Sequence, residues 1–283
     1  MGARCATCAE QGQQAAEAVD AGVQKAIPQS AFASNALDPA FGKGVAEDSV
    51  HTFENGATYT GGMIGGQRFG FGTQVWTDGA RYEGQWQDDM AHGQGRFVHS
   101  SGDIYEGDWH ADKAHGVGKY IHTDGSTYEG QWHHDRQCGQ GVERWADGAR
   151  YEGGYVDGKK HGRGRFDWVD GSSYHGEFVD NEIHGEGIYK WADERTYEGQ
   201  WANNQMQGRG LFRWPDGRQY QGEYLQDMKH GRGTYKWPDG REYTGQWQEG
   251  RQHGEGVQMS KDRVSRRGAW AAGKRTHWLD ERE

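Results

Sequence analysis

Aromatic residues and glycine alternate with polar residues along most of the chain. In RYEGQWQ, residues 81–87, Tyr82, Gly84 and Trp86 occupy every second position, and glutamate or glutamine stands between them. Successive side chains of a β-strand point to opposite faces of a sheet, so this alternation predicts a strand with one ring-and-glycine face and one polar face. HGQGRF, residues 92–97, continues the alternation and predicts a second strand.

The pattern recurs at a fixed step of 23 residues. With the leading tyrosine as position 1, positions 3, 12 and 14 are always glycine, and position 5 is aromatic in every repeat but the first. Positions 16 and 18 are often aromatic, and Asp-Gly at positions 20 and 21 signals a tight turn. Each repeat therefore predicts a β-hairpin with a loop of about six residues between its strands. The leading tyrosines are Tyr59, Tyr82, Tyr105, Tyr128, Tyr151, Tyr174, Tyr197, Tyr220 and Tyr243.

Glycine beside the rings lets a flat ring lie against the backbone, where a Cβ would push it away. Glycine in a strand costs about 0.5–1 kcal/mol relative to alanine, whereas burying an aromatic side chain contributes about 4–6 kcal/mol. One hairpin cannot bury its rings alone, so neighbouring hairpins must stack. The predicted fold is all-β, an elongated single-layer antiparallel sheet of stacked β-hairpins.

The repeating phrase, Y-E-G-x-W followed by H-G-x-G and W-x-D-G, resembles the MORN (membrane occupation and recognition nexus) repeat. Nine tandem copies run from residue 59 to about residue 262. Phe69, Cys138 and Gln207 depart from the usual histidine at position 11, and Asp262-Arg263 replaces Asp-Gly in the ninth repeat. The resemblance implies roles in scaffolding, membrane association or cytoskeletal organisation. In some such proteins the array is an accessory to a lipid kinase or a methyltransferase domain.

Three segments follow from the repeats: residues 1–50, the array at 51–264, and a cap and tail at 265–283. Residues 51–58 align with the second half of a repeat and predict a leading strand. Gly268 and Trp270 fall at positions 3 and 5 of a tenth repeat, which predicts a half-repeat cap. Terminal strands of an open sheet have unpaired edges, so one expectation is a homodimer formed through them.

Basic residues gather around the cap. Charge on an edge strand commonly blocks pairing with other chains. The alternative is a surface for an acidic partner or for the anionic headgroups of a membrane phospholipid. The residues of this basic patch are Arg263, Arg266, Arg267, Lys274 and Arg275.

The first 50 residues are rich in alanine and glutamine and contain no repeat. Thr7 and Glu10 have the spacing of a capping box, and apolar residues recur every four positions from Ala15 to Ile27. This pattern predicts a helix over about residues 8–27, ended by Pro28, and a linker from there to residue 50.

The opening MGARCATC has the residues of a lipid anchor. Myristoylation of Gly2 with palmitoylation of Cys5 or Cys8 would supply the two signals that stable anchoring requires. The alternative is a start with two ordinary thiols. A lone C-x-x-C without a second ligand pair is weak evidence for a metal or redox site.

Charge and composition exclude several classes of function. A formal net charge of −10 disfavours a nucleic-acid partner, which selects a basic surface. Three cysteines do not make a disulfide framework, which favours a reducing, intracellular setting. We expect no secretory signal and no bilayer-spanning segment, because apolar runs are short.

Histidine at position 11 in six repeats raises the question of a metal site. Equivalent atoms of successive hairpins should lie about 9–10 Å apart, whereas zinc binds imidazole nitrogens at about 2.0–2.1 Å, so no metal site is expected. The G-x-G pairs lie within strands and lack the helix of a phosphate loop. No catalytic set of side chains stands out, and we expect no enzymatic activity and no cofactor.

The aromatic face is the candidate binding surface. Rings that stay accessible would form a groove for an apolar helix or an extended peptide of a protein partner; the alternative is that they are only the core. The predicted function is a non-catalytic scaffold or adaptor, cytoplasmic or peripheral to a membrane, that tethers partners to a membrane or to a cytoskeletal structure such as a cilium or axoneme. A phospholipid-binding module and a regulatory accessory subunit of an enzyme such as a lipid kinase are the alternatives. The groove residues are Trp86, Trp109, Trp132, Tyr155, Phe178, Trp201, Tyr224 and Trp247.

Overall fold

A computed structural model of the chain describes residues 50–279, and every regular element in that range is a strand. The chain divides into two compact units, residues 1–162 and residues 163–283, and strand β11 (Lys159–Asp167) crosses the boundary. The predicted helix over 8–27 lies outside the described residues, as do Gly2, Cys5 and Cys8. Among residues 50–279, no helix has the length and apolarity needed to cross a bilayer.

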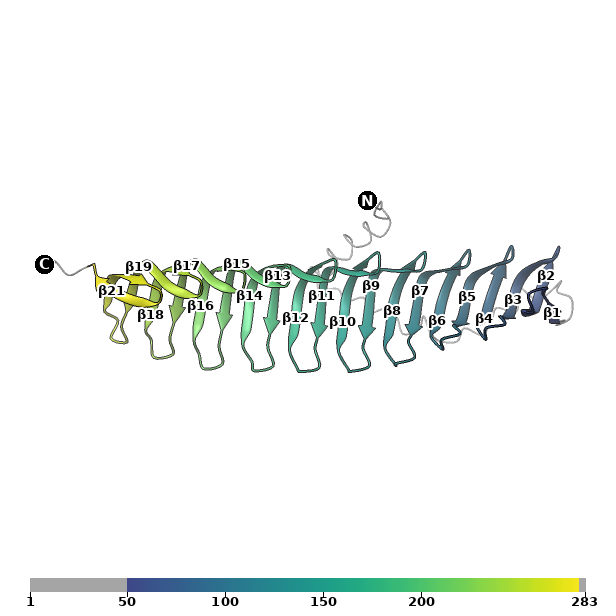
Figure 1. The fold of residues 1–283 in the computed structure, drawn as a ribbon, viewed down its shortest axis with the longest axis horizontal. Coiled ribbons are helices and arrows are strands. Elements are labelled where there is room, and N and C mark those ends of the chain that lie inside the picture. The colour runs from purple at the N-terminus through teal and green to yellow at the C-terminus, as the bar shows by residue number, and fades with distance from the viewer. Residues whose placement is uncertain (1–49, 280–283) are drawn as a thin grey trace. The chain divides into compact units, whose positions relative to one another are not determined.

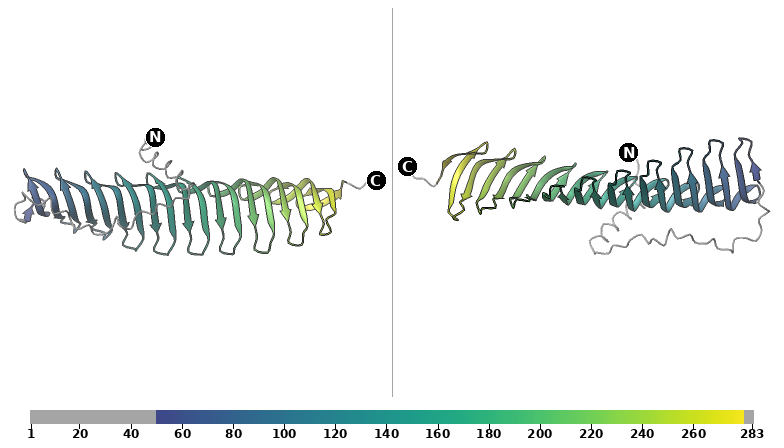
Figure 2. Two further views of the ribbon diagram at one scale, coloured as in Figure 1. Left: turned by 180° about the vertical axis from the view of Figure 1, so that it is seen from behind. Right: turned by 90° about the horizontal axis from the view of Figure 1, so that it is seen from below.

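The first unit is a single layer of antiparallel strands in which each strand from β1 to β10 pairs with the next one in sequence (Figures 1 and 2). Its strands are β1 (Val50–Thr52), β2 (Thr58–Ile64), β3 (Gln67–Val75), β4 (Arg81–Gln87), β5 (Met90–Val98), β6 (Ile104–His110), β7 (Lys113–Ile121), β8 (Thr127–His133), β9 (Arg136–Arg144), β10 (Arg150–Val156) and the start of β11.

The second unit has the same arrangement, with each strand from β12 to β21 paired to the next. Its strands after the end of β11 are β12 (Ser173–Val179), β13 (Glu182–Lys190), β14 (Thr196–Ala202), β15 (Gln205–Arg213), β16 (Gln219–Leu225), β17 (Met228–Lys236), β18 (Glu242–Gln248), β19 (Arg251–Met259), β20 (Ser265–Ala271) and β21 (Lys274–Trp278). The predicted all-β, single-layer antiparallel fold is confirmed within each unit.

The turn inside each hairpin is shorter than the sequence predicts. A strand that begins one residue before the leading tyrosine ends at position 6, and the next strand already begins at position 9. Positions 7 and 8, such as Asp88 and Asp89 or His134 and Asp135, have positive φ angles, as a two-residue type I′ turn requires. The predicted six-residue loop is therefore wrong, and the histidine row at position 11 lies within a strand.

A bulge at the position-12 glycine explains why the second strand is two residues longer than the first. Gly93 has a φ of 63°, and the strand register shifts in the same part of the hairpin. The side chain at position 4 crosses to this bulge: Gln85 Oε1 accepts a hydrogen bond of 2.8 Å from the amide of Gln94. In other repeats the side-chain oxygens at position 4 accept the same hydrogen bond from the position-13 amide; they belong to Asp108, Gln131, Gln200 and Glu223.

The connection between repeats is the turn that Asp-Gly predicts. The amide of Trp76 donates to the carbonyl of Ala80 at 2.9 Å, Asp78 Oδ1 accepts from the amide of Ala80, and Gly79 has a φ of 90°. The ninth repeat keeps this turn without glycine, because Arg263 itself adopts a φ of 63°.

The leading tyrosines form the centre of the buried layer. Each ring lies over the glycines at positions 3 and 14 of its own hairpin, and a Cβ on Gly95 would lie 2.6 Å from Cζ of Tyr82. All nine hydroxyls donate to the backbone carbonyl at position 4, over 2.9–3.1 Å. All nine rings are at most 2 % exposed. The predicted packing of rings over glycine is thus observed in every repeat.

Two contacts recur between adjacent repeats, the first where position 5 is tryptophan and the second where position 8 is aspartate. The position-5 tryptophan donates from Nε1 to the position-14 carbonyl of the preceding repeat, as Trp109 does to Gly95 at 3.1 Å. The position-8 aspartate pairs with position 10 of the preceding repeat: Asp112 donates its amide to the Ala91 carbonyl and accepts the Ala91 amide at Oδ1. Adjacent hairpins are therefore held in register by side chains as well as by the strand ladder.

The two terminal segments of the array differ, because the first has one strand and the last has two. The leading strand predicted over 51–58 is confined to β1, since residues 53–57 form a turn. Strand β1 leads into a turn in which the amide of Phe53 donates to the carbonyl of Ala57, as in the internal connections. At the other end, β20 and β21 form a hairpin, with Trp270 buried at position 5 and in contact with Trp278. The expected cap thus has a second strand, and β21 is the last strand of its sheet among the described residues.

We expect Gly95→Ala to destabilise the protein by about 1–3 kcal/mol, because its Cβ would overlap the Tyr82 ring. Urea unfolding followed by tryptophan fluorescence measures the loss. Gly250→Asn is the control: Gly250 has a φ of 77° and open space around it, and asparagine already occupies the same turn position at Asn204. The control should change stability by less than about 0.5 kcal/mol. Equal losses in both variants would contradict ring-over-glycine packing.

We expect stability to fall as pH rises above about 10. Burial raises the pKa of Tyr59 and of Tyr243 to about 12, and it raises the pKa of the other leading tyrosines as well. Through these tyrosines the folded chain holds more protons than the unfolded chain between about pH 10 and 12, so their contribution to stability is constant below this window and is lost through it. Urea midpoints against pH, with tyrosinate absorbance, test this. Ionisation of these tyrosines near pH 10 in the folded protein would contradict it.

Candidate functional site: an aromatic groove

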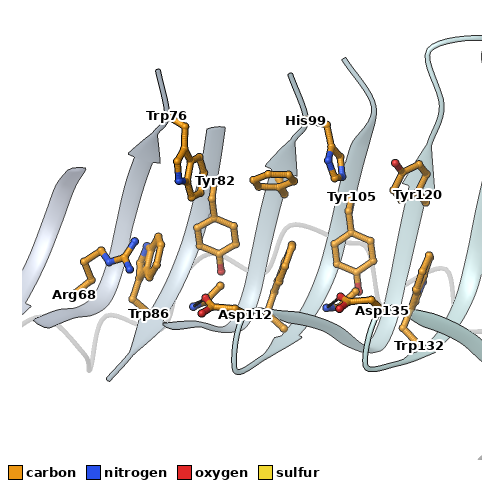
Figure 3. A pocket seen from close by; sticks show the side chains of 14 residues that line it. Arg68, Trp76, Tyr82, Trp86, His99, Tyr105, Asp112, Tyr120, Trp132 and Asp135 are labelled. Carbon is orange, nitrogen blue, oxygen red and sulfur yellow. Dashed lines mark hydrogen bonds between the residues drawn. The ribbon is translucent and has the colours of Figure 1, made fainter. Parts of the chain in front are cut away.

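A groove of about 510 Å³ opens on the aromatic face of the first unit. It lies where position 10 is alanine, at Ala91 on β5 and Ala114 on β7, so that the rings of neighbouring strands enclose space instead of a long side chain. Figure 3 shows the labelled rings on successive strands with Asp112 and Asp135 beside them. We call this the ring groove; its lining residues are Arg68, Trp76, Tyr82, Trp86, Ala91, Phe97, His99, Tyr105, Trp109, Asp112, Ala114, Tyr120, Trp132 and Asp135.

In three other repeats the equivalent space is occupied by a positively charged side chain at position 10. Position 10 is Arg68 in the first repeat, Lys160 in the fifth and Lys229 in the eighth. Lys160 Nζ lies 4.8 Å from the Trp145 ring centroid and 2.8 Å from Glu143 Oε2. The space beside position 10 is therefore one in which this chain buries positive charge.

Lys229 shows the cage most completely. Its Nζ lies 4.7–5.4 Å from the centroids of Trp214, Tyr220, Tyr235 and Trp247. Ring faces attract cations, and the attraction grows when the cation is desolvated. Burial, with the nearby charge of Arg218 as a smaller cause, lowers the pKa of Lys229 to about 8.

The rings around Ala91 occupy the same repeat positions as the rings around Lys229 and have similar centroid spacings, although their tilts differ: Trp76 and Phe97 meet at 75°, and Trp214 and Tyr235 meet at 49°. The ring centroids of Trp76 and Phe97 are 5.5 Å apart, and those of the equivalent pair Trp214 and Tyr235 are 5.7 Å apart. Tyr82 and Trp109 are separated by 5.2 Å, against 5.1 Å for Tyr220 and Trp247. The space beside Ala91 is thus lined by rings at the same repeat positions as those around Lys229, and we call it a cage.

A second cage surrounds Ala114 in the next repeat. Its rings are His99, Tyr105, Tyr120 and Trp132, with Tyr105 at 5.3 Å and Tyr120 at 6.3 Å from Trp132. Equivalent atoms of adjacent repeats lie two strand spacings apart, or about 9–10 Å. The two cages are therefore neighbours along one groove.

Arg68 shows how a guanidinium sits in such a cage. Its Cζ lies 3.9 Å from the Trp86 centroid, and its Nε lies 2.7 Å from Asp89 Oδ1. The hydrogen bond from Arg68 is the main cause that lowers the pKa of Asp89. The following repeats present the same tryptophan and aspartate, as Trp109 with Asp112 and as Trp132 with Asp135, but with alanine in place of arginine.

The structure places most of the predicted groove residues in the core. Seven of the eight position-5 side chains are at most 9 % exposed, and Trp109 is partly buried. Trp86, Trp109 and Trp132 also line the ring groove, so at these three positions one ring serves both the core and the open surface. The sequence prediction missed Ala91 and Ala114, although small residues at position 10 are visible when the repeats are aligned.

The basic patch is partly engaged within its own cap. Arg266 and Arg275 lie over the Trp278 ring, with Cζ at 4.3 and 3.9 Å from its centroid, and Arg267 pairs with Glu255 at 3.2 Å. A lipid or an acidic partner at this patch stays a prediction.

The histidines of the polar face form a cluster that the sequence argument did not anticipate. His115 at position 11 lies beside His133 and His134, at positions 6 and 7 of the next repeat, and not beside another position-11 histidine. Burial and the neighbouring imidazoles lower the pKa of His115, and burial and His134 lower that of His133.

The fold and the ring groove define a tandem-repeat protein built of stacked β-hairpins. Nine consecutive segments match the model of the MORN repeat, and the chain belongs to the MORN repeat family. The matched residues are 59–81, 82–104, 105–127, 128–150, 151–173, 174–194, 197–217, 220–240 and 243–263. No curated protein sequence matches this chain.

Several solved structures show distant similarity. The CPAP G-box domain, from a structural analysis that suggests a role in centriole elongation, is 12 % identical over 71 % of this chain and 100 % of its own, with a TM-score of 0.39. The SAS-4 (dCPAP) TCP domain of Drosophila melanogaster, solved with a proline-rich motif of Ana2, is 12 % identical over 63 % and 85 %, with a TM-score of 0.31. The wild-type TCP10 domain of Danio rerio CPAP is 12 % identical over 82 % and 100 %, with a TM-score of 0.24. Similarities this distant carry no argument about function.

We expect Ala91→Arg to leave stability within about 1 kcal/mol of the wild type, because the new guanidinium meets the rings and a carboxylate as Arg68 does. Ala91→Glu is the matched control and should destabilise by about 1–3 kcal/mol, since it places a carboxylate against ring faces and beside Asp112. Urea unfolding of both variants is the measurement. Equal losses would show that the cage does not favour cations.

Proposed function

We propose that this protein is a non-catalytic adaptor that holds a basic, extended segment of a partner protein in the ring groove and tethers that partner to a membrane or cytoskeletal structure inside the cell. The observation that carries the proposal is the side chain of Arg68, which already occupies the first position of this groove, stacked on Trp86 and paired with Asp89. The tethering role rests on what membership of the MORN repeat family implies.

The ring groove supplies the chemistry that such a segment needs. Aromatic faces and the carboxylates of Asp112 and Asp135 line it, and a net charge of −10 favours the approach of a basic partner. A rigid strand array presents these groups without a conformational change, which lowers the entropy cost of binding.

The spacing of the two cages selects a sequence pattern in the partner. Cages about 9–10 Å apart match two side chains three residues apart in a peptide that adopts the extended polyproline II conformation, which rises about 3.1 Å per residue and has three residues per turn, so that residues i and i+3 lie on the same face. Arginine suits the site better than lysine, because a planar guanidinium both stacks on tryptophan and pairs with a carboxylate. The expected motif therefore has two arginines separated by two small or apolar residues.

We expect a fluorescein-labelled peptide with this Arg-x-x-Arg pattern to bind the full chain with micromolar affinity, measured by fluorescence anisotropy. A peptide with citrulline at both positions keeps the shape and removes the charge, and it should bind at least about tenfold more weakly. The Arg-x-x-Arg peptide should also lose affinity as salt rises, because part of the attraction is Coulombic.

Matched variants locate the site. Ala91→Arg with Ala114→Arg fills both cages from within and should abolish binding of the peptide. Met206→Arg with Gln252→Arg adds the same charge at position 10 of two other repeats, outside the ring groove, and should leave binding intact. If the filled groove bound the peptide as tightly as the wild type, the proposal would be wrong.

A further inference from the structure

Three imidazoles meet on the polar face of the first unit, on the side of the sheet opposite to the ring groove. His115 lies in β7, His133 ends β8, and His134 is the first residue of the turn that follows. Each offers a ring nitrogen, and the three nitrogens lie within 4.8 Å of one another. The ring centroids of His115 and His133 are 5.1 Å apart, and those of His133 and His134 are 4.2 Å apart.

The distances suit a transition-metal ion. Two nitrogens bound to tetrahedral zinc at about 2.0–2.1 Å lie about 3.3–3.4 Å apart. Nδ1 of His133 and Nδ1 of His134 are already separated by 3.4 Å. One ring nitrogen of His115 lies within 4.8 Å of a ring nitrogen of each of the other two, so the side chains must move closer by up to about 1.5 Å to bind one ion.

An unsatisfied nitrogen supports the same reading. Nδ1 of His115 is buried and has no hydrogen-bond partner. A buried polar atom without a partner costs about 1–3 kcal/mol, so it requires an explanation such as a bound ion or water. A metal ion bound by His115 through this nitrogen would supply the missing partner.

We propose that His115, His133 and His134 form a binding site for one divalent transition-metal ion, of which Zn²⁺ is the reference case. Imidazole ligands suit Zn²⁺, Ni²⁺ and Cu²⁺, whereas Mg²⁺ and Ca²⁺ prefer oxygen. Three protein ligands leave one tetrahedral position for water or for a residue of another molecule. The ion would join β7 of one repeat to the turn of the next.

Comparison among the repeats shows why the site occurs once within the described array. A position-11 histidine needs histidines at positions 6 and 7 of the following repeat. His184 is followed by Ala202 and Asn203 at those positions, and His230 by Gln248 and Glu249. Only His115 has histidine at both positions, which distinguishes it from the general histidine row.

The first experiment titrates Zn²⁺ into tag-free, chelator-stripped full-length protein by isothermal titration calorimetry. We expect one Zn²⁺ per chain and a rise in melting temperature, since a ligand bound only by the folded state stabilises it. The titration is repeated with Cys5→Ser and Cys8→Ser, which removes the terminal thiols and should leave the stoichiometry at one. Absence of binding up to millimolar Zn²⁺, or loss of binding with the cysteines, would overturn the proposal.

Substitutions borrowed from other repeats remove the ligands without new strain. His115→Gln, His133→Gln and His134→Asn place residues that already occupy these positions as Gln207, Gln87 and Asn203. Each single variant should weaken Zn²⁺ binding at least about tenfold, and the triple variant should abolish it. His184→Gln is the matched control and should change nothing. Unaltered binding in the triple variant would exclude this site, and circular dichroism of each variant separates lost ligands from lost fold.

The converse experiment builds the site elsewhere. Ala202→His with Asn203→His reproduces the three-histidine pattern beside His184 in the second unit. We expect the stoichiometry to rise from one Zn²⁺ to two. A stoichiometry that stays at one in a folded variant would show that the repeat positions do not create a site, and it would overturn the geometric account.

Discussion

Every repeat depends on one contact, the tyrosine ring lying flat over two glycines of its own hairpin. This contact buries the tyrosine ring and brings its hydroxyl to the position-4 carbonyl. It also requires glycine at positions 3 and 14, because a Cβ at either position would overlap the ring. A single sheet has no second layer to cover its rings, so the rings must be buried against the backbone of the same sheet. Glycine is the residue that allows this, and its backbone cost is smaller than the gain from burying the ring.

The tyrosine contact also explains why the array extends from hairpin to hairpin. In most repeats the tyrosine ring meets the position-5 ring of its own repeat and that of the next, for example Tyr82 with Trp86 at 4.9 Å and with Trp109 at 5.2 Å between ring centroids. Trp109 also donates a hydrogen bond from Nε1 to the carbonyl of Gly95 in the preceding repeat. Burial in one repeat is thus completed by the next, which is the nearest-neighbour coupling typical of repeat proteins.

The fold was predictable from sequence because this contact leaves a strict pattern of tyrosine, glycine and tryptophan. The inner turn was missed because repeats such as those with Ala111-Asp112 and His134-Asp135 adopt positive φ angles without the Asn-Gly or Asp-Gly signal that normally marks a type I′ turn, although Gly65-Gly66 and Asp157-Gly158 carry such a signal at the same two positions. Because the predicted loop was too long, position 11 was expected to lie outside a strand. Its place beside positions 6 and 7 of the next repeat was therefore not apparent from the sequence. The histidine cluster was missed for this physical reason, since the distance argument compared only equivalent positions.

The candidate sites lie where the repeats are free to differ. The ring-and-glycine contact restricts which residues can occupy positions 1, 3, 5 and 14. A substitution at one of them is expected to destabilise two adjacent hairpins. Position 10 is not so constrained: alanine, glutamine, isoleucine, methionine, lysine and arginine all occur there, and its length decides whether a cage is filled from within or left open. Positions 6 and 7 vary in the same way on the polar face. In an array whose core is uniform, we expect recognition to come from these variable positions, and the ring groove and the histidine cluster are two places among residues 50–162 where their variation brings chemically compatible groups together.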